Sequence, residues 1–262
     1  MKEHLKAEIY VVSHKDTRMP QDKMYYPLQV GSAKENFPGF LRDNTGDNIA
    51  EKNPNYCELT AQYWAAKNRN AADIKGLVHY RRLFSNGKRN FFSSVDKKFA
   101  DVMTSDTLAK LMESYDLILP TKRNYYIETS WSQYAHVHHE KDLVVTREVI
   151  AEKYPDYLPA FDKWVNRRAV HKFNMLIAKA DIFDQYTEWL IDVLEEVERR
   201  IDISDYTPYE QRVYGFLSEI LIDVWVEKQG IKYKEIPVMF MGNQHWVKKI
   251  SKFLLRKVRG RA

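Results

Sequence analysis

The most informative segment of the sequence spans residues 73–82 and reads Asp73-Ile74-Lys75-Gly76-Leu77-Val78-His79-Tyr80-Arg81-Arg82. It is a short apolar run that passes directly into a histidine, a tyrosine and two arginines. A run of this length is typical of a buried strand, and α/β folds present ligand sites at the carboxyl ends of such strands. The segment therefore predicts a central strand over 74–78 with a candidate site at its end.

The same pattern recurs on both sides of this segment. Residues 8–13 form an apolar, β-branched run that opens into Ser13-His14-Lys15-Asp16, and residues 115–120 form a third run. Helical spacing between these runs, over 55–68 and 106–114, gives the order strand, helix, strand, helix, strand. This order predicts an α/β fold with a mostly parallel central sheet.

The rest of the chain is predicted to contain one irregular region, further helices and two further strands. Residues 16–55 are rich in Pro, Gly, Asn and Asp and are predicted to be irregular. The spacing of apolar residues predicts two long amphipathic helices, over 181–200 and 211–228, and partly helical structure over 131–147. Further strands are predicted over 173–178 and 233–239.

Composition restricts the class of protein. The 262 residues are 44% hydrophobic and 29% charged, as in ordinary globular proteins, and no repeat or linker divides them. The single cysteine, Cys57, excludes an internal disulfide and a cysteine-built metal site, so we expect a reducing, cytoplasmic location. The first apolar run, 9–12, is too short for a signal peptide or a membrane span. We expect one domain over residues 1–245.

The end of the chain, residues 246–262, is predicted to be a basic amphipathic tail. Its cations are Lys248, Lys249, Lys252, Arg256, Lys257, Arg259 and Arg261, and apolar residues recur between them at helical spacing. Such a tail is typical of a contact with the anionic inner face of the cell membrane. Contact with nucleic acid and a solvated helix end are the alternatives.

Several segments together resemble a known bacterial family. They are Ile9-Tyr10-Val11-Val12-Ser13-His14-Lys15, Asn44-Thr45-Gly46-Asp47-Asn48-Ile49, Tyr56-Cys57-Glu58-Leu59-Thr60, Tyr63-Trp64-Ala65-Ala66-Lys67-Asn68, Gly76-Leu77-Val78-His79-Tyr80-Arg81-Arg82, His138-His139-Glu140-Lys141-Asp142-Leu143, Phe173-Asn174-Met175 and Gln211-Arg212-Val213. In this order they resemble the capsular-polysaccharide and O-antigen biosynthesis proteins, catalogued as a domain of unknown function and assigned to the glycosyltransferases. The resemblance covers about residues 8–240.

This resemblance implies a fold and an activity. The fold is a GT-A-like, Rossmann-type αβα sandwich. The activity is transfer of a hexose from a uridine-diphosphate sugar to a growing surface polysaccharide or glycolipid, with galactofuranose as the leading donor sugar.

The residue types fit the electrostatics of such a reaction. The leaving diphosphate gains negative charge, and the attacking hydroxyl must lose a proton. Many GT-A enzymes hold a metal with an Asp-x-Asp motif, whereas this sequence has His79-Tyr80-Arg81-Arg82 at the corresponding place. Arg81 and Arg82 are therefore candidates to bind the phosphates directly, and His79 to bind a metal, a phosphate or a sugar hydroxyl. A surface ion pair and a solvated arginine are the alternative, and dependence on Mn²⁺ or Mg²⁺ is left open.

The other candidate donor contacts follow from strand ends and turns. Ser13, His14 and Lys15 end the first strand, where we expect the nucleotide. Asp47 and Asn48 are candidates for contacts with the ribose or uracil, although Gly-Asp-Asn is also ordinary turn chemistry. Asn174 is a candidate contact with the donor sugar or the cap of a strand.

The proton acceptor is assigned first to Asp142, with His79 and Glu219 as further candidate catalytic groups and Asp116 in reserve. His136, His138 and His139 are predicted to contact the acceptor, with a polar surface as the alternative. A zinc site at these histidines is disfavoured, because neighbouring residues of a helix do not face one ion.

Three other classes of function remain as alternatives. A non-catalytic scaffold with a transferase fold is disfavoured because polar groups are dense at the strand ends. A nucleic-acid-binding module is disfavoured because the basic residues gather in the tail instead of alternating with aromatic residues. A hydrolase with paired carboxylates is the last, and no pairing stands out in the sequence.

Overall fold

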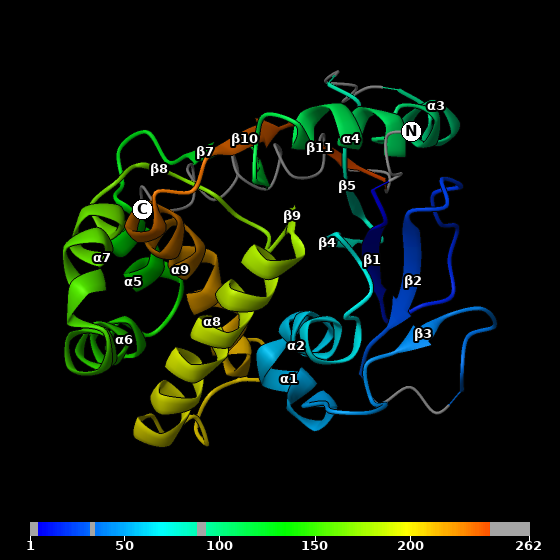
Figure 1. Ribbon diagram of the computed structural model, residues 1–262. Helices are drawn as coiled ribbons and strands as arrows, with labels where there is room; N and C mark the ends of the chain where they lie inside the picture. Colours follow the sequence, from blue (N-terminus) through cyan, green and yellow to red (C-terminus); the bar gives the residue numbers. More distant parts are fainter. Residues whose placement is uncertain (1–4, 32–34, 88–92, 242–262) are drawn as a thin grey trace, which may run out of the picture.

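The computed structural model describes residues 5–31, 35–87 and 93–241, and its centre is a single large sheet (Figure 1). The main row of strands is, in order, β10 (Tyr233–Ile236), β6 (Leu117–Pro120), β9 (Leu176–Lys179), β4 (Ile74–His79), β1 (Ala7–Ser13), β2 (Tyr25–Gln29) and β3 (Leu41–Arg42). Strand β5 (Arg82–Phe84) pairs with β4 and with β11 (Val238–Phe240). A separate small sheet joins β7 (Arg123–Asn124) and β8 (Ala169–Val170).

Strand directions confirm the predicted fold class. β1 runs parallel to both β2 and β4, β2 runs parallel to β3, and β6 runs parallel to β10. β9 is antiparallel to both of its neighbours, β4 and β6. The carboxyl ends of β1, β4 and β6 therefore meet at one edge of the sheet, as the sequence predicts for a ligand site.

Helices cover both faces of this sheet. On one face lie α3 (Val95–Ala100) and α4 (Ser105–Met112), and on the other lie α1 (Asn53–Tyr56), α2 (Leu59–Asn68), α8 (Ala180–Arg200) and α9 (Val213–Gln229) (Figure 1). The helices α5 (Ser130–Val137), α6 (Glu140–Lys153) and α7 (Leu158–Val165) pack outside α8 and α9. Short 3-10 turns are η1 (Ala50–Lys52), η2 (Pro155–Tyr157) and η3 (Glu210–Arg212).

The alternation of side chains along the strands builds one core on each face. In β1, Ile9 and Val11 point to the α4 side, whereas Tyr10 and Val12 point to the side of α2 and α8. Gly76 in β4 allows close packing between neighbouring strands, because a Cβ atom there would lie 2.7 Å from Ile177 Cγ1. The central strands that carry the candidate site are therefore packed against a core on each face of the sheet.

Some boundaries differ from the predictions. The helix predicted over 55–68 is two helices, because Cys57 has a φ of 55° and breaks the chain between α1 and α2. The strand predicted over 173–178 begins only at Leu176, since Phe173 and Asn174 also have positive φ. The region 16–55, predicted to be irregular, contains β2 and β3.

Two predictions concern the membrane. The basic tail, 246–262, lies outside the described residues. Among the residues that the structure describes, no helix combines the length and the apolar character needed to cross a bilayer.

Candidate functional site

The site begins at a tight hairpin between β4 and β5. His79 and Arg82 are direct partners across this hairpin, which leaves Tyr80 and Arg81 as its tip. Residues paired in this way project to the same face of a sheet. His79 lies two residues after Leu77 in β4, and Leu77 belongs to the core under α2 and α8. The hairpin therefore aims His79 and Arg82 towards the amino-terminal ends of α2 and α9.

His79 is held between a backbone carbonyl and a carboxylate. Its Nε2 lies 2.6 Å from the carbonyl oxygen of Phe173 and 3.8 Å from a carboxylate oxygen of Glu58. A carbonyl oxygen only accepts, so Nε2 carries the proton and Nδ1 is the acceptor in the neutral ring. The orientation and tautomer of this imidazole are thus set by the protein.

Asn174 ties three separate segments together beside His79. Its amide nitrogen donates to Glu58 Oε1 at 2.8 Å and to the Gly215 carbonyl at 2.9 Å, and its oxygen accepts from Ser218 Oγ at 2.8 Å. The residue is 9% exposed, and its amide atoms are used by these contacts. Asn174 therefore positions Glu58, and it is placed as a positioning residue rather than as a direct contact with the donor sugar.

Unusual backbone conformations gather at this point. Cys57, Phe173 and Asn174 have φ values of 55°, 83° and 46°, and Tyr126 is the one other non-glycine residue with positive φ among the described residues. Such conformations cost on the order of 1–3 kcal/mol each and cluster at functional sites. Their concentration around Glu58 and His79 independently marks this corner as a candidate site.

Three arginine side chains lie at the site. The Arg82 guanidinium lies 4.6 Å from the centre of the Phe173 ring, and its Nε is buried with no hydrogen-bond partner among the described residues. Burial lowers the pKa of Arg82. Arg212, just before α9, donates from Nε to Cys57 Sγ at 3.2 Å. Arg81 at the hairpin tip is exposed and lies over the ring of Tyr80.

The end of β1 joins this group of cations. The His14 ring meets the Tyr80 ring edge-on at 5.5 Å. The pKa of His14 is lowered, first by burial and then by the charges of Lys15, Arg81 and Arg212. Ser13 shapes the turn, since its Oγ donates to the Lys15 carbonyl at 2.6 Å and accepts from the Lys15 N–H at 3.1 Å. The structure thus brings His14 and Lys15 together with the arginines, as predicted for strand ends.

The opposite wall of the site is built by α9 and the segment before β9. Glu219 accepts from the Phe173 N–H at 2.9 Å and lies 3.2 Å from Lys172 Nζ. Burial is the largest influence and favours the neutral amine of Lys172, but the charge of Glu219 and the contacts with Tyr125 together outweigh it and raise the pKa of Lys172. Glu219, predicted as a catalytic candidate, therefore lies at the site as a carboxylate paired with a lysine.

His138 and Phe216 form an aromatic surface next to Glu219. Their rings stack with centres 4.1 Å apart, and the Tyr209 ring lies 5.2 Å from that of Phe216. Burial, assisted by the charge of Lys172, lowers the pKa of His138 to about 4, so this ring is neutral near pH 7. Its Nδ1 is buried with no partner among the described residues.

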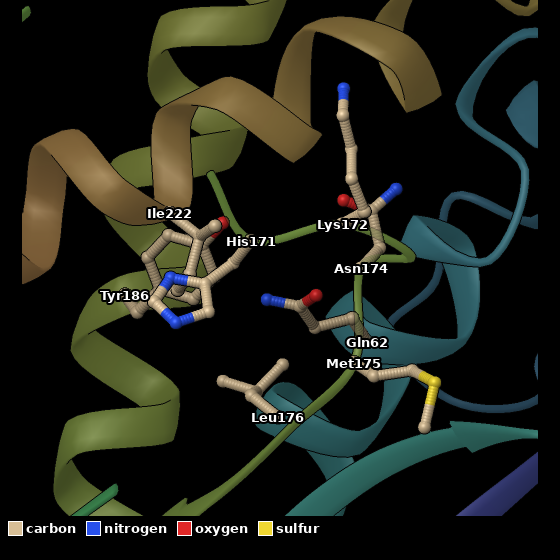
Figure 2. Close-up of a pocket in the computed structure, with 8 residues that line it drawn as sticks. All are labelled: Gln62, His171, Lys172, Asn174, Met175, Leu176, Tyr186 and Ile222. Atoms are coloured by element: carbon tan, nitrogen blue, oxygen red, sulfur yellow. The ribbon is translucent and has the colours of Figure 1, made fainter. Parts of the chain in front are cut away.

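A small cavity lies behind the segment that carries Lys172 and Asn174 (Figure 2). Gln62 and His171 border it from the core side, and the amino end of Lys172 points away from them. His171 is 1% exposed, and its backbone N–H donates to Asp223 at 2.9 Å. These buried polar contacts anchor the segment from behind, which leaves its other side to form the site.

Asp47, Asn48 and Asp116 are not brought to the site. The Asp47 N–H donates to Asn68 Oδ1 at 3.1 Å, at the carboxyl end of α2, whereas Glu58 precedes the amino end of that helix. Ten helical residues separate the two ends by about 15 Å. Asn48 donates to the Gly46 carbonyl within the turn. Asp116 pairs with Lys179 before β6 begins, at the opposite edge of the sheet. Turn chemistry and a surface ion pair account for these three residues.

The three predicted histidines and Asp142 lie in different surroundings. Asp142, the first choice for the base, is 1% exposed and accepts from the Tyr206 hydroxyl at 2.7 Å, so it is enclosed rather than open to an acceptor. His139 stacks on Tyr206 at 3.9 Å, and the exposed His136 pairs with Glu128. Of the three histidines, His138 is the one that the geometry places beside Glu219.

The sequence alone did not single out Glu58, Lys172, Phe173 and Arg212 as functional. They come from loops and helix starts that are distant in the chain from the strand ends. Glu58, Phe173 and Arg212 nevertheless lie in segments that carry the family resemblance. Nowhere in residues 5–31, 35–87 and 93–241 do three or more His, Cys, Asp or Glu side chains gather as metal ligands would.

Comparison with known proteins identifies the family. A domain of unknown function, DUF4422, matches residues 8–230. The apo structure of the WbbM bifunctional glycosyltransferase is similar, with a TM-score of 0.82 and 30% identity over 91% of this chain and 46% of that one. The chain therefore spans just under half the length of that protein. No curated protein matches the chain. Because the match covers most of the sequence and confirms the predicted resemblance, this chain belongs to the DUF4422 family.

Proposed function

We propose that this protein is a GT-A-like glycosyltransferase that transfers a hexose from a uridine-diphosphate sugar to a glycan or lipid-linked glycan. The likeness to a bifunctional glycosyltransferase and the family membership support a transferase. The observation that carries the proposal is the group of cations at the carboxyl ends of β1 and β4, with two carboxylates, Glu58 and Glu219, close enough to act on the charge of Arg82.

The cations fit a diphosphate. Arg82 offers a buried Nε donor that has no partner among the described residues, and Arg81 and Arg212 are close enough to depress its pKa further. Guanidinium groups bind phosphate oxygens through paired donors of fixed geometry. In a site shielded from water they also stabilise the charge that develops on a leaving diphosphate. Lys15 and His14 extend this surface along the end of β1.

The carboxylates and the aromatic surface fit an acceptor. Glu219 and Glu58 are half-buried, with side chains 22% and 14% exposed, and each is held by a defined partner. A carboxylate beside the acceptor hydroxyl would take its proton, and we assign this role to Glu219, with Glu58 as the alternative. The rings of Tyr209 and Phe216 offer flat apolar faces on which a sugar ring packs.

The finer assignments extend this proposal. The donor sugar is galactofuranose, as the family resemblance implies, and the acceptor belongs to a surface polysaccharide. We further propose that the enzyme works on the inner face of the cell membrane.

The test is calorimetric titration of the purified protein with uridine diphosphate, with and without Mn²⁺. We expect binding that weakens roughly 10- to 100-fold in Arg82→Ala, the loss of a charge-assisted contact. Arg199→Ala is the matched control, because Arg199 is exposed and pairs with Glu196 near the end of α8. If wild-type protein binds no uridine diphosphate in either condition, the proposal fails. Equal affinities in Arg82→Ala and Arg199→Ala would remove Arg82 from the phosphate site.

A further inference from the structure

The turn between β7 and α5 presents two large apolar side chains to solvent. Tyr126 is 77% exposed and Ile127 is 85% exposed, the highest values for large hydrophobic residues among those that the structure describes. Single exposed apolar residues are common on protein surfaces. Two consecutive ones at the tip of a turn form a compact apolar protrusion, which we call the 126–127 tip.

The backbone of the 126–127 tip is held in place by hydrogen bonds. The Tyr126 N–H donates to Asn124 Oδ1 at 2.7 Å, and the Ile127 N–H donates to the Tyr125 carbonyl at 2.7 Å. Arg168 Nη1 donates to the Tyr126 carbonyl at 3.2 Å. Tyr126 also keeps a φ of 63°, which costs energy for a tyrosine. The fold therefore projects these side chains outwards instead of letting them collapse onto the surface.

Arginines surround the tip. Arg123 in β7 and Arg167 and Arg168 before β8 are exposed, and β7 pairs with β8 directly. Within the described residues, none of the three lies within 4 Å of a carboxylate. The nearby acids are already engaged, Asp162 with Arg147 and Glu128 with His136. The charge of Arg167 also acts on Glu227, which itself pairs with Lys163. The tip thus combines an apolar end with three arginines that have no direct ion pair among the described residues.

We propose that the 126–127 tip docks on an anionic lipid surface. Tyr126 and Ile127 enter the headgroup region, and Arg123, Arg167 and Arg168 lie against the lipid phosphates. Aromatic and apolar side chains bordered by arginine favour such interfaces. Two protruding side chains are far less than the roughly 1,000 Å² of buried surface that a stable protein interface needs. The small area of the tip argues against a protein partner, and the charge of the arginines is complementary to an anionic lipid surface.

The tip is connected to the candidate site. Lys172 Nζ lies 5.7 Å from the centre of the Tyr125 ring, and Lys172 pairs with Glu219. Figure 1 shows β7 and β8 beside β10, at the end of the sheet away from β2 and β3. Docking through the tip would bring the Glu219 wall of the site near the lipid surface. The docking itself does not depend on the proposed transferase activity.

The first test places a fluorescent probe at the tip of the full-length chain. An environment-sensitive fluorophore is attached at Cys in Ile127→Cys, and at Cys in Val95→Cys as a control on α3. Unsubstituted protein labelled in parallel gives the background from Cys57, whose pKa burial raises to about 11 and whose labelling is therefore slow. With vesicles of phosphatidylglycerol and phosphatidylethanolamine we expect a blue shift at position 127 only. An unchanged spectrum at position 127 would overturn the proposal. A blue shift that appears on raising the protein concentration without vesicles would also overturn it, because a second copy would then cover the tip.

The second test measures vesicle binding by sedimentation. Tyr126→Ser/Ile127→Ser is expected to weaken partition at least about tenfold, from the loss of two buried apolar side chains. Val95→Ser, which removes an apolar side chain that is 38% exposed elsewhere, is expected to leave partition unchanged. Arg167→Ala/Arg168→Ala is expected to weaken binding to anionic vesicles roughly tenfold or more, and to affect neutral phosphatidylcholine vesicles little. Every variant keeps residues 246–262, so equal partition of wild type and the tip variant would show that another part of the chain binds the membrane and would refute docking through the tip.

Discussion

Replacement of Asn174 tests how the corner around Glu58 is held. The side chain makes three hydrogen bonds, to Glu58, the Gly215 carbonyl and Ser218, and it sits at a φ of 46°. Asn174→Ala removes all three bonds and places a residue with a Cβ but no local hydrogen bonding in the left-handed region. Asn174→Gly removes the same bonds but relieves the conformation.

The structure sets the size of both effects. Three hydrogen bonds at about 1 kcal/mol each predict a loss of roughly 3 kcal/mol of unfolding free energy in Asn174→Ala. The left-handed conformation costs a non-glycine residue about 1–2 kcal/mol, and glycine gives back about 0.5–1 kcal/mol of this through the entropy of the unfolded chain. We therefore expect Asn174→Gly to be about 0.5–1 kcal/mol more stable than Asn174→Ala.

Urea unfolding followed by circular dichroism measures both quantities, with equal slopes required for the comparison. A loss below about 1 kcal/mol in Asn174→Ala would show that the three bonds are replaced by water. Equal stability of the two variants would refute the argument from backbone conformation. If the transferase proposal holds, both variants should lower kcat with little change in the donor KM, because Asn174 holds Glu58 and the start of α9, which carries Glu219, rather than touching the donor.

Two further predictions concern the central sheet. Burial acts to raise the pKa of Glu8, but hydrogen bonds from Arg69, Tyr10 and Lys6 outweigh it and lower that pKa, so this stabilisation is present above about pH 4.5 and is lost as pH falls through the folded-state pKa. Arg69→Met should thus lower the free energy of unfolding by about 2–3 kcal/mol at pH 7. The loss should be smaller at pH 4, because protonation of Glu8 removes the unpaired charge. A loss of stability that is as large at pH 4 as at pH 7 would contradict this. Gly76→Ala should cost about 1–3 kcal/mol, because its Cβ would lie 2.7 Å from Ile177 Cγ1 and 2.8 Å from Ile9 Cδ1, and an unchanged thermal midpoint would show that these side chains move aside freely.

The central strands could be predicted because burial on both faces leaves a direct mark on the sequence. Apolar runs over 8–13, 74–78 and 115–120 correspond to β1, β4 and β6, and the polar residues after the first two do meet at one edge. Strands β2 and β3 have no such apolar run in the sequence. β2 contains Pro27 and β3 has two residues, so neither shows the length or alternation by which strands are recognised.

The site was predictable only where it follows from strand ends. His14, Lys15 and Arg82 follow from that rule, whereas Arg212 and Lys172 reach the site through loops far along the chain. Asp47 and Asp142 lie in segments that carry the family resemblance, but neither lies at the site. Asp47 belongs to a turn that is hydrogen-bonded to α2, and Asp142 is hydrogen-bonded to Tyr206. Periodicity identifies which residues face a core, but it does not say which loops converge.

The segment 172–174 shows why the pattern fails where the site is built. A strand continuing through Phe173 and Asn174 would alternate these residues between the two faces of the sheet. Instead both residues have positive φ. The resulting turn directs the carbonyl of Phe173 to His79 and the N–H of Phe173 to Glu219. It also directs the side-chain amide of Asn174 to Glu58. Each contact fixes a polar group that an extended chain would leave elsewhere, and together they offset the roughly 1–3 kcal/mol that each conformation costs. The departure from strand geometry is therefore what joins the end of β4, the start of α2 and the wall of α9 into one site.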